Sequence, residues 1–68
     1  MAIHSNRRAL AQHHVDSGRL VIERQRLLVA KVQARGHDAS EFESMLDAFE
    51  QTQAIFESDL AGIIKRQR

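Results

Sequence analysis

The sequence predicts an all-α fold, a two-helix antiparallel hairpin with coiled-coil-like packing that dimerises into a four-helix bundle. Composition is the first indication, because proline is absent and only three glycines occur in 68 residues. The second is a single turn signal near residue 36, which separates two long segments of helical periodicity. The third is charge, because the two segments carry opposite signs and attract each other when the chain folds back.

The charge is divided sharply along the chain. Residues 1–36 contain seven Arg or Lys and two acidic residues, whereas residues 37–64 contain seven acidic residues and no Arg or Lys. A chain this short buries too little surface for a comfortable core, and natural proteins of this size add disulfides, a metal or a second copy. Since cysteine is absent, disulfides are excluded, and we expect self-association.

Gly36 marks the end of the first helix. We expect that helix over about residues 5–35, then a turn over 36–39 and a second helix over about 40–66, all in one domain of residues 1–68. Glycine suits the left-handed residue that closes a helix, because it has no Cβ.

The N-termini of both helices leave alternatives open. For the second helix, Ser40 with Glu43 has the spacing of a capping box, and Asp38 is a rival cap two residues earlier. For the first helix, Ser5 and Asn6 are the candidate caps.

Alternating steps of three and four residues predict one seam along each helix. Three seam positions are glycine or glutamine where an apolar residue is expected. The seam of the first helix consists of Val15, Gly18, Ile22, Gln25, Val29 and Val32. The seam of the second helix consists of Phe42, Leu46, Phe49, Gln53, Phe56, Leu60 and Ile63.

Folding the seams together leads to two expectations about the polar interruptions. Gly18 falls opposite the stretch from Phe56 to Leu60 and makes room for an aromatic ring. The alternative is a kink or fray of the helix at Gly18. Gln25 falls opposite the stretch from Phe49 to Gln53, so the two glutamines meet and satisfy each other's hydrogen bonds.

Charged residues recur every seven positions beside the seams. We expect Arg26 to pair with Glu50 and Arg19 to pair with Glu57. Exposed pairs of this kind stabilise little, so they set the register of the hairpin more than its stability.

A second apolar set lies outside the seam of the first helix and beside the seam of the second. Exposed sets of this kind mark interfaces, and the alternative is that the leucines are scattered over the surface. The candidate dimer interface consists of Leu20, Leu27, Met45, Phe56 and Ile63.

The residues that carry chemistry form no familiar site. His13 and Asp16 are the only ligand pair at helical spacing, and two ligands do not make a metal site. No phosphate-binding loop or Ser-His-Asp set is present, and the longest apolar run, from Leu27 to Ala30, is too short to span a membrane. We therefore expect a cytoplasmic protein without enzyme activity or cofactor.

The leading hypothesis is a non-enzymatic protein-interaction module that binds itself and another protein of unknown identity. The runner-up is a small nucleic-acid-associated regulator that uses the basic chain ends, Arg7 and Arg8 with Lys65, Arg66 and Arg68. Nucleic acid is disfavoured because the first helix lacks aromatic residues for stacking and the acidic second helix lies beside it. A histidine-based metal carrier is a third and distant reading.

Several short motifs follow one another along residues 14–59: Arg24-Gln25-Arg26, Gly36-His37-Asp38, Met45-Leu46 and Phe49-Glu50. This pattern resembles a large group of short, uncharacterised bacterial proteins, and the resemblance implies a helical hairpin but no activity. Many members of the group carry threonine after the Gly-His-Asp triplet and histidines late in the second helix. Here Ala39, Phe56 and Asp59 stand at those places, so no role of those histidines carries over.

Overall fold

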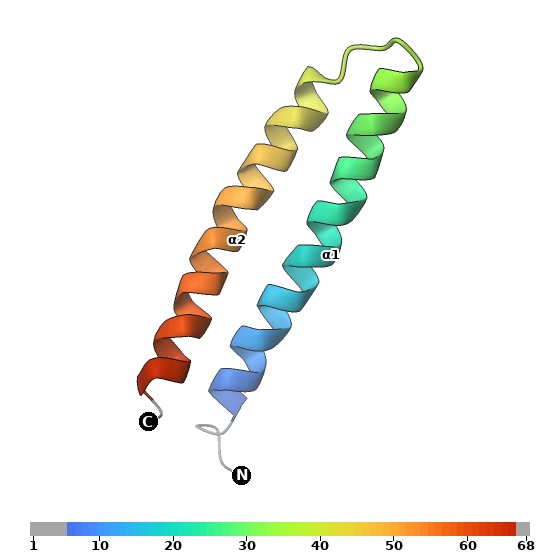
Figure 1. Cartoon of the computed structure of the whole chain (residues 1–68). Helices are drawn as coiled ribbons and strands as arrows, with labels where there is room; N and C mark the ends of the chain where they lie inside the picture. Colours follow the sequence, from blue (N-terminus) through green and yellow to red (C-terminus); the bar gives the residue numbers. More distant parts are fainter. Residues whose placement is uncertain (1–5, 67–68) are drawn as a thin grey trace.

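The structure is a computed structural model that describes residues 6–66, and it contains two α-helices. They are α1 (Asn6–Ala34) and α2 (Ser40–Arg66). Figure 1 shows the helices side by side and antiparallel, with the turn at one end and both ends of the described chain at the other. The predicted two-helix hairpin is confirmed. Ser5, one of the two candidate caps of the first helix, lies outside the described residues.

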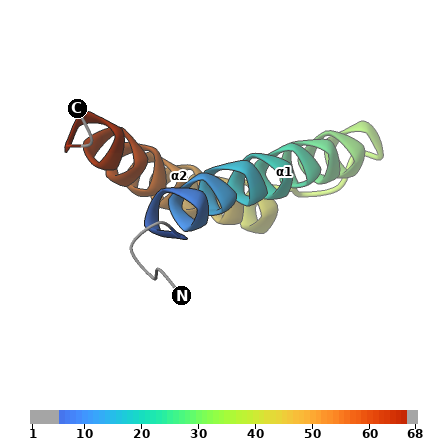
Figure 2. The same cartoon turned by 90° about the horizontal axis from the view of Figure 1, so that it is seen from below.

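The hairpin is a thin rod that measures 51 × 19 × 14 Å. One α-helix with its side chains is about 10–12 Å across, so the smallest dimension corresponds to a single layer of helices. Seen from below, the two helix axes cross at an angle (Figure 2). A single layer leaves both broad sides of the hairpin exposed to solvent.

The C-terminus of α1 is closed by the glycine that the sequence indicated. Gly36 has a φ of 75°, and its N–H donates to the carbonyl of Gln33 at 2.9 Å. The N–H of His37 donates to the carbonyl of Val32 at 3.1 Å. This pair of bonds is a Schellman motif, which satisfies carbonyls that the end of the helix leaves without a partner.

Asp38 rather than Ser40 caps the N-terminus of α2. The Asp38 carboxylate accepts the N–H of Ser40 at 2.9 Å, and the capping box of Ser40 with Glu43 does not form. Glu43 instead accepts a bond from the side chain of Gln33 at 3.4 Å. Hydrogen bonds from the backbone and then the side chain of Ser40 lower the pKa of Asp38. This stabilising contribution is therefore lost only when the pH falls through that lowered pKa.

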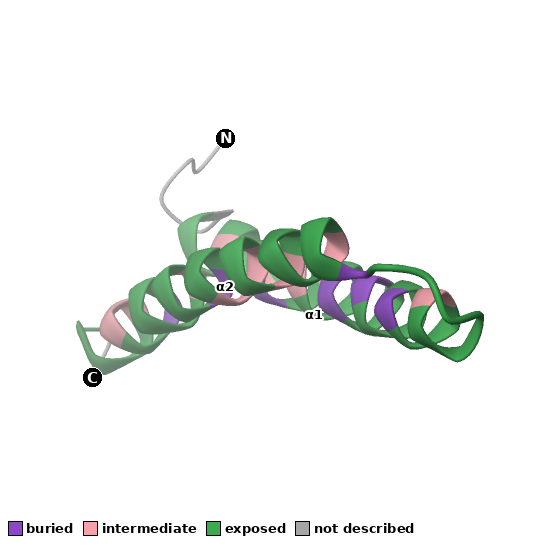
Figure 3. Ribbon diagram, turned by 90° about the horizontal axis from the view of Figure 1, so that it is seen from above, coloured by how far each residue is buried: buried purple, intermediate pink, exposed green. Residues whose placement is uncertain are grey.

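The predicted seams form the interior of the hairpin. Figure 3 shows the buried positions along the sides where the helices face each other. Every one of the thirteen predicted seam residues is buried or half-buried. Sequence analysis missed Ala39, which is 5% exposed and whose carbonyl accepts the N–H of Glu43 at the start of α2. The buried hydrophobic residues are Val15, Ile22, Val29, Ala39 and Leu60.

The two seam glutamines do not meet, so that expectation was wrong. Gln25 donates through Nε2 to the carbonyl of Phe42, and Gln53 donates through Nε2 to the carbonyl of Val15, each at 2.9 Å. Each glutamine thus bonds to the backbone of the opposite helix. A carbonyl inside a helix can accept such a bond, because its intrahelical bond occupies only one of two lone pairs.

Gly18 accommodates Gln53 and not an aromatic ring, which corrects the second expectation. A Cβ atom at Gly18 would overlap Oε1 of Gln53. Gln53 precedes Phe56 by almost one helical turn, so the expected neighbour of Gly18 was wrong, although the expected pairs Arg26–Glu50 and Arg19–Glu57 both form. α1 continues through Gly18 without interruption, so the helix does not fray there.

We predict that Gly36→Val lowers the free energy of unfolding by at least about 1 kcal/mol, because a β-branched residue is strained at positive φ. Gly36→Asn is the matched control, since asparagine tolerates this conformation and should retain most of the stability. Chemical denaturation followed by circular dichroism measures both. Equal stability of the valine and asparagine variants would contradict the left-handed cap.

A second prediction concerns the contact between Gly18 and Gln53. With Gln53→Ala in the background, Gly18→Ala should stabilise by about 1 kcal/mol through helix propensity. In the natural sequence the same change displaces the Gln53 amide from Val15, and a buried amide without its bond costs about 1–3 kcal/mol. A double-mutant cycle should therefore show coupling of at least about 1 kcal/mol. Gly62→Ala, whose Cβ meets only Arg66 at 3.8 Å, should have the same effect in both backgrounds.

Candidate functional site

The two broad sides of the hairpin differ in chemistry. On one side, α1 and α2 carry opposite charges that lie across from each other. Arg26 Nη2 lies 2.8 Å from Glu50 Oε2, and Arg19 Nε lies 3.8 Å from Glu57 Oε2. These are the pairs that the seven-residue spacing predicted, and we call this side of the hairpin, defined by these four residues, the charged side.

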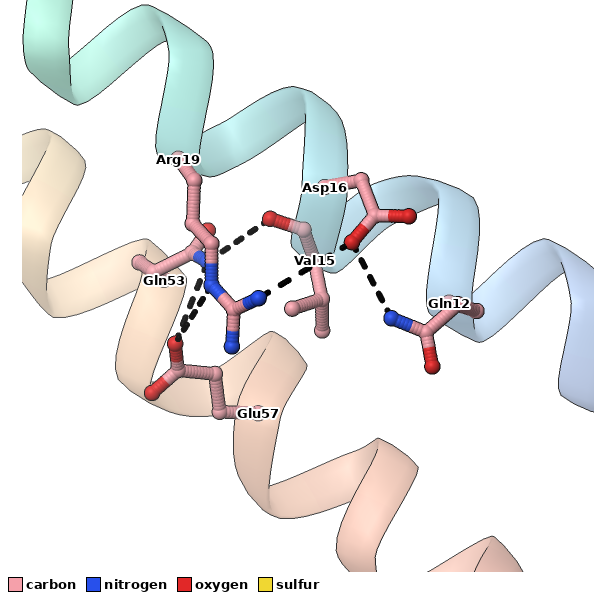
Figure 4. A network of polar contacts seen from close by, with 6 residues as sticks. All are labelled: Gln12, Val15, Asp16, Arg19, Gln53 and Glu57. Atoms are coloured by element: carbon pink, nitrogen blue, oxygen red, sulfur yellow. Dashed lines mark hydrogen bonds and ion pairs between the residues drawn. The ribbon is translucent and has the colours of Figure 1, made fainter.

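A polar network links the charged side to the seam (Figure 4). Gln53 Nε2, besides its bond to the Val15 carbonyl, lies 3.3 Å from Glu57 Oε2. Arg19 Nη1 lies 4.0 Å from Asp16 Oδ1, and Gln12 Nε2 donates to the same oxygen at 3.0 Å. The charges on this side are therefore largely matched within the hairpin itself.

The opposite side carries a shallow groove between the helices, lined mainly by apolar atoms. Its first stretch is lined by His14, Ser17, Gly18 and Val21 with Phe49, Thr52, Gln53 and Phe56. A second stretch, toward the open end, is lined by Arg7, Leu10, Ala11 and His14 with Phe56, Asp59, Ile63 and Arg66. Both stretches share His14 and Phe56, so these two residues lie where the stretches meet.

Helical periodicity extends this side toward the turn. Leu28 follows Val21 by seven residues and Met45 precedes Thr52 by seven, so each lies on the same face of its helix. We call this side of the hairpin the apolar side. It is defined by Leu10, His14, Val21, Leu28, Met45, Phe56 and Ile63.

The imidazole of His14 lies where the two stretches of the groove meet. Its ring is stacked on the Phe56 ring, with centroids 5.1 Å apart and planes inclined by 15°. His13 is its neighbour in the chain, and the ring centroids of the two histidines are 6.2 Å apart. Sequence analysis considered His13 only as a metal ligand paired with Asp16, and it missed the stack of His14 on Phe56.

The structure does not gather the five residues of the candidate dimer interface onto one face. Met45, Phe56 and Ile63 belong to the apolar side. Leu27 instead borders Glu23 and Arg26. Its place on the helix explains this: Leu27 and Leu20 follow seam residues by five positions, about 140° around the helix. Leu20 and Leu27 therefore do not share a side of the hairpin with the other three residues, and the candidate dimer interface stays a prediction.

The residues that sequence analysis missed are Val21 and Leu28, together with Leu10. Val21 is 41% exposed and Leu28 is 39% exposed, which is high for large apolar side chains. The signal was present, because both follow a seam residue by three positions and so border the seam.

Other combinations of reactive side chains lack the geometry of a catalytic or metal site. Ser17 Oγ lies 3.5 Å from His13 Nε2, which is beyond the usual range for a hydrogen bond from a hydroxyl. The surrounding backbone N–H groups belong to α1 and are used within the helix, so none is free to stabilise an oxyanion. Among residues 6–66, no three His, Cys, Asp or Glu side chains lie close enough to hold a metal ion.

The basic chain ends come together only in part. Arg7 and Arg66 line the same stretch of the groove, and the acidic Asp59 lines it too. Arg68 lies outside the described residues. Neither α1 nor α2 has an apolar stretch of the length that crossing a membrane requires.

Comparisons with models of protein families, with curated proteins and with solved structures find no match for this chain.

We predict that Glu50→Arg destabilises the hairpin and that adding Arg26→Glu recovers part of the loss. The reason is the ion pair at 2.8 Å, which the reversed charges can restore. Because both side chains are exposed, the recovered coupling should be under about 1 kcal/mol. Denaturation at low and high salt measures the cycle, and a strictly additive result at low salt would count against the pair.

Proposed function

We propose that the chain is a non-enzymatic protein-interaction module whose apolar side binds a second copy of itself to form a four-helix bundle. The observation that carries the proposal is the contrast between the two broad sides. Charges on the charged side are paired across the hairpin, whereas the apolar side exposes large hydrophobic side chains beside a shallow groove.

The size of the core supports a second copy as the occupant. Only five hydrophobic residues are buried in the described chain, one of them an alanine, whereas eight large hydrophobic residues are at least 39% exposed. A hairpin one helix thick cannot bury more by itself. Placing two apolar sides face to face creates a two-layer core, which is the usual way for amphipathic helix pairs to shield their apolar stripes.

A self-complementary surface also fits the chemistry of this side. The exposed side chains in its middle are aliphatic on both helices, with Val21 and Leu28 on α1 and Met45 on α2. An isologous dimer apposes the same surface patch on both copies. The apposed surfaces are therefore apolar in the middle, and the charged Arg7, Asp59 and Arg66 lie at the open end. A cytoplasmic location and a further protein partner remain predictions.

We predict that light scattering coupled to size exclusion gives about twice the chain mass. Val21→Glu/Leu28→Glu should reduce this to the mass of one chain, because burying unpaired carboxylates between apolar sides is costly. Leu20→Glu/Leu27→Glu is the matched control, with the same number of new charges one position away on α1, and should remain a dimer. Circular dichroism must show that both variants are helical.

The melting temperature provides a second readout of the same prediction. It should rise with protein concentration if the folded species is a dimer, by mass action. A natural protein with the mass of one chain and a melt that does not depend on concentration would refute the dimer. Loss of the dimer in the Leu20/Leu27 control with its retention in the Val21/Leu28 variant would restore the interface that the sequence predicted.

The second candidate function is binding of nucleic acid by the basic chain ends, and one observation favours it: Arg7 and Arg66 line a common groove. An electrophoretic shift that weakens steeply with salt would support it, because phosphate contacts release counterions. Because Asp59 and the other acidic residues of α2 lie nearby, nucleic-acid binding is the weaker candidate function.

A further inference from the structure

His14 is the titratable side chain that lies where the two stretches of the groove on the apolar side meet. It lines both stretches of the groove, and its ring is stacked on Phe56. In a dimer formed through this side, the imidazole passes from partial exposure to burial between two hairpins. Histidine is the side chain whose charge ordinarily changes between about pH 5 and pH 8.

The groups around His14 do little to stabilise a positive charge. Arg7, Arg66 and Asp59 line the same stretch of the groove, so two cations and one carboxylate face it from the two helices. The neighbouring ring of His13 has its centroid 6.2 Å from that of His14. Within residues 6–66, His14 forms no ion pair with a carboxylate.

We infer that the dimer is pH-sensitive and that protonation of His14 dissociates it; this inference rests on the dimer proposed above. A charged imidazolium loses water when the apolar sides meet, and it gains no paired carboxylate in exchange. The neutral ring loses little hydration free energy when it is buried, and it keeps its stack on Phe56. The dimer therefore binds fewer protons than two monomers, so acid shifts the equilibrium toward monomers.

The test is the dissociation constant of the natural protein measured by sedimentation equilibrium at about pH 8 and about pH 5.5, where histidine changes charge and carboxylates do not. Each dimer buries two His14 rings, so a difference of one pKa unit per ring changes the constant by up to about a hundredfold. We expect the dissociation constant to be at least about tenfold higher at the lower pH, which corresponds to a difference of about one pKa unit at a single ring.

Two complementary variants assign the effect. His14→Gln removes the titrating ring and should dimerise with nearly equal affinity at both pH values. The converse variant, His4→Gln/His13→Gln/His37→Gln, leaves His14 as the only histidine and should keep the full pH dependence. His14→Phe retains an aromatic ring against Phe56, so it should also be insensitive to pH and guards against loss of packing in the glutamine variant.

The outcomes separate the two proposals. A natural protein that is monomeric at both pH values would overturn the dimer and this inference together. A dimer of equal affinity at both pH values would overturn the inference alone. A pH dependence that persists in His14→Gln and disappears in the triple variant would assign the effect to another histidine. That result would also overturn the inference about His14.

Discussion

The register of the hairpin depends on two buried glutamines that reach across the seam. Gln25 bonds to the Phe42 carbonyl of α2, and Gln53 bonds to the Val15 carbonyl of α1. A buried amide must find a partner or pay its desolvation cost, so each bond penalises any sliding of one helix along the other. Aliphatic contacts are much less selective, because a slide by one seam position replaces one apolar neighbour with another.

The buried glutamines that fix the register also lower the stability of the hairpin, as the surroundings of Gln53 show. Its Nε2 donates to Val15, but its Oε1 is buried without a hydrogen-bond partner. That oxygen occupies the space that a side chain at Gly18 would fill. A polar residue in a coiled-coil seam that lowers stability while it specifies alignment is a known arrangement, and glycine on the facing helix is what makes this one sterically possible.

With the register set, the flanks of the seams fall into two different sides. On the charged side, arginines of α1 meet glutamates of α2, and little charge is left for an outside partner. On the other side, the groove around His14 and Phe56 is bordered by aliphatic side chains, and its ionic groups gather at the open end. The apolar side is therefore where association would gain most free energy, since apolar burial contributes roughly 25 cal/mol per Å².

The sequence by itself determined the two helices, the turn at Gly36, the faces that form the seam and the pairs Arg26–Glu50 and Arg19–Glu57. These features follow from local rules: helical periodicity, the conformational freedom of glycine, and charges repeated every seven residues. The tertiary structure alone decided which atoms the glutamines bond, what lies against Gly18 and which cap begins α2. Seam positions recur about every 3.5 residues, and backbone carbonyls are available at every step, so the pattern fixes a face of each helix but not its offset along the axis. The separation of Leu20 and Leu27 from Met45, Phe56 and Ile63 has the same origin. Packing of the two helices decides which residues beside the seam of α1 lie on the same side of the hairpin as residues beside the seam of α2.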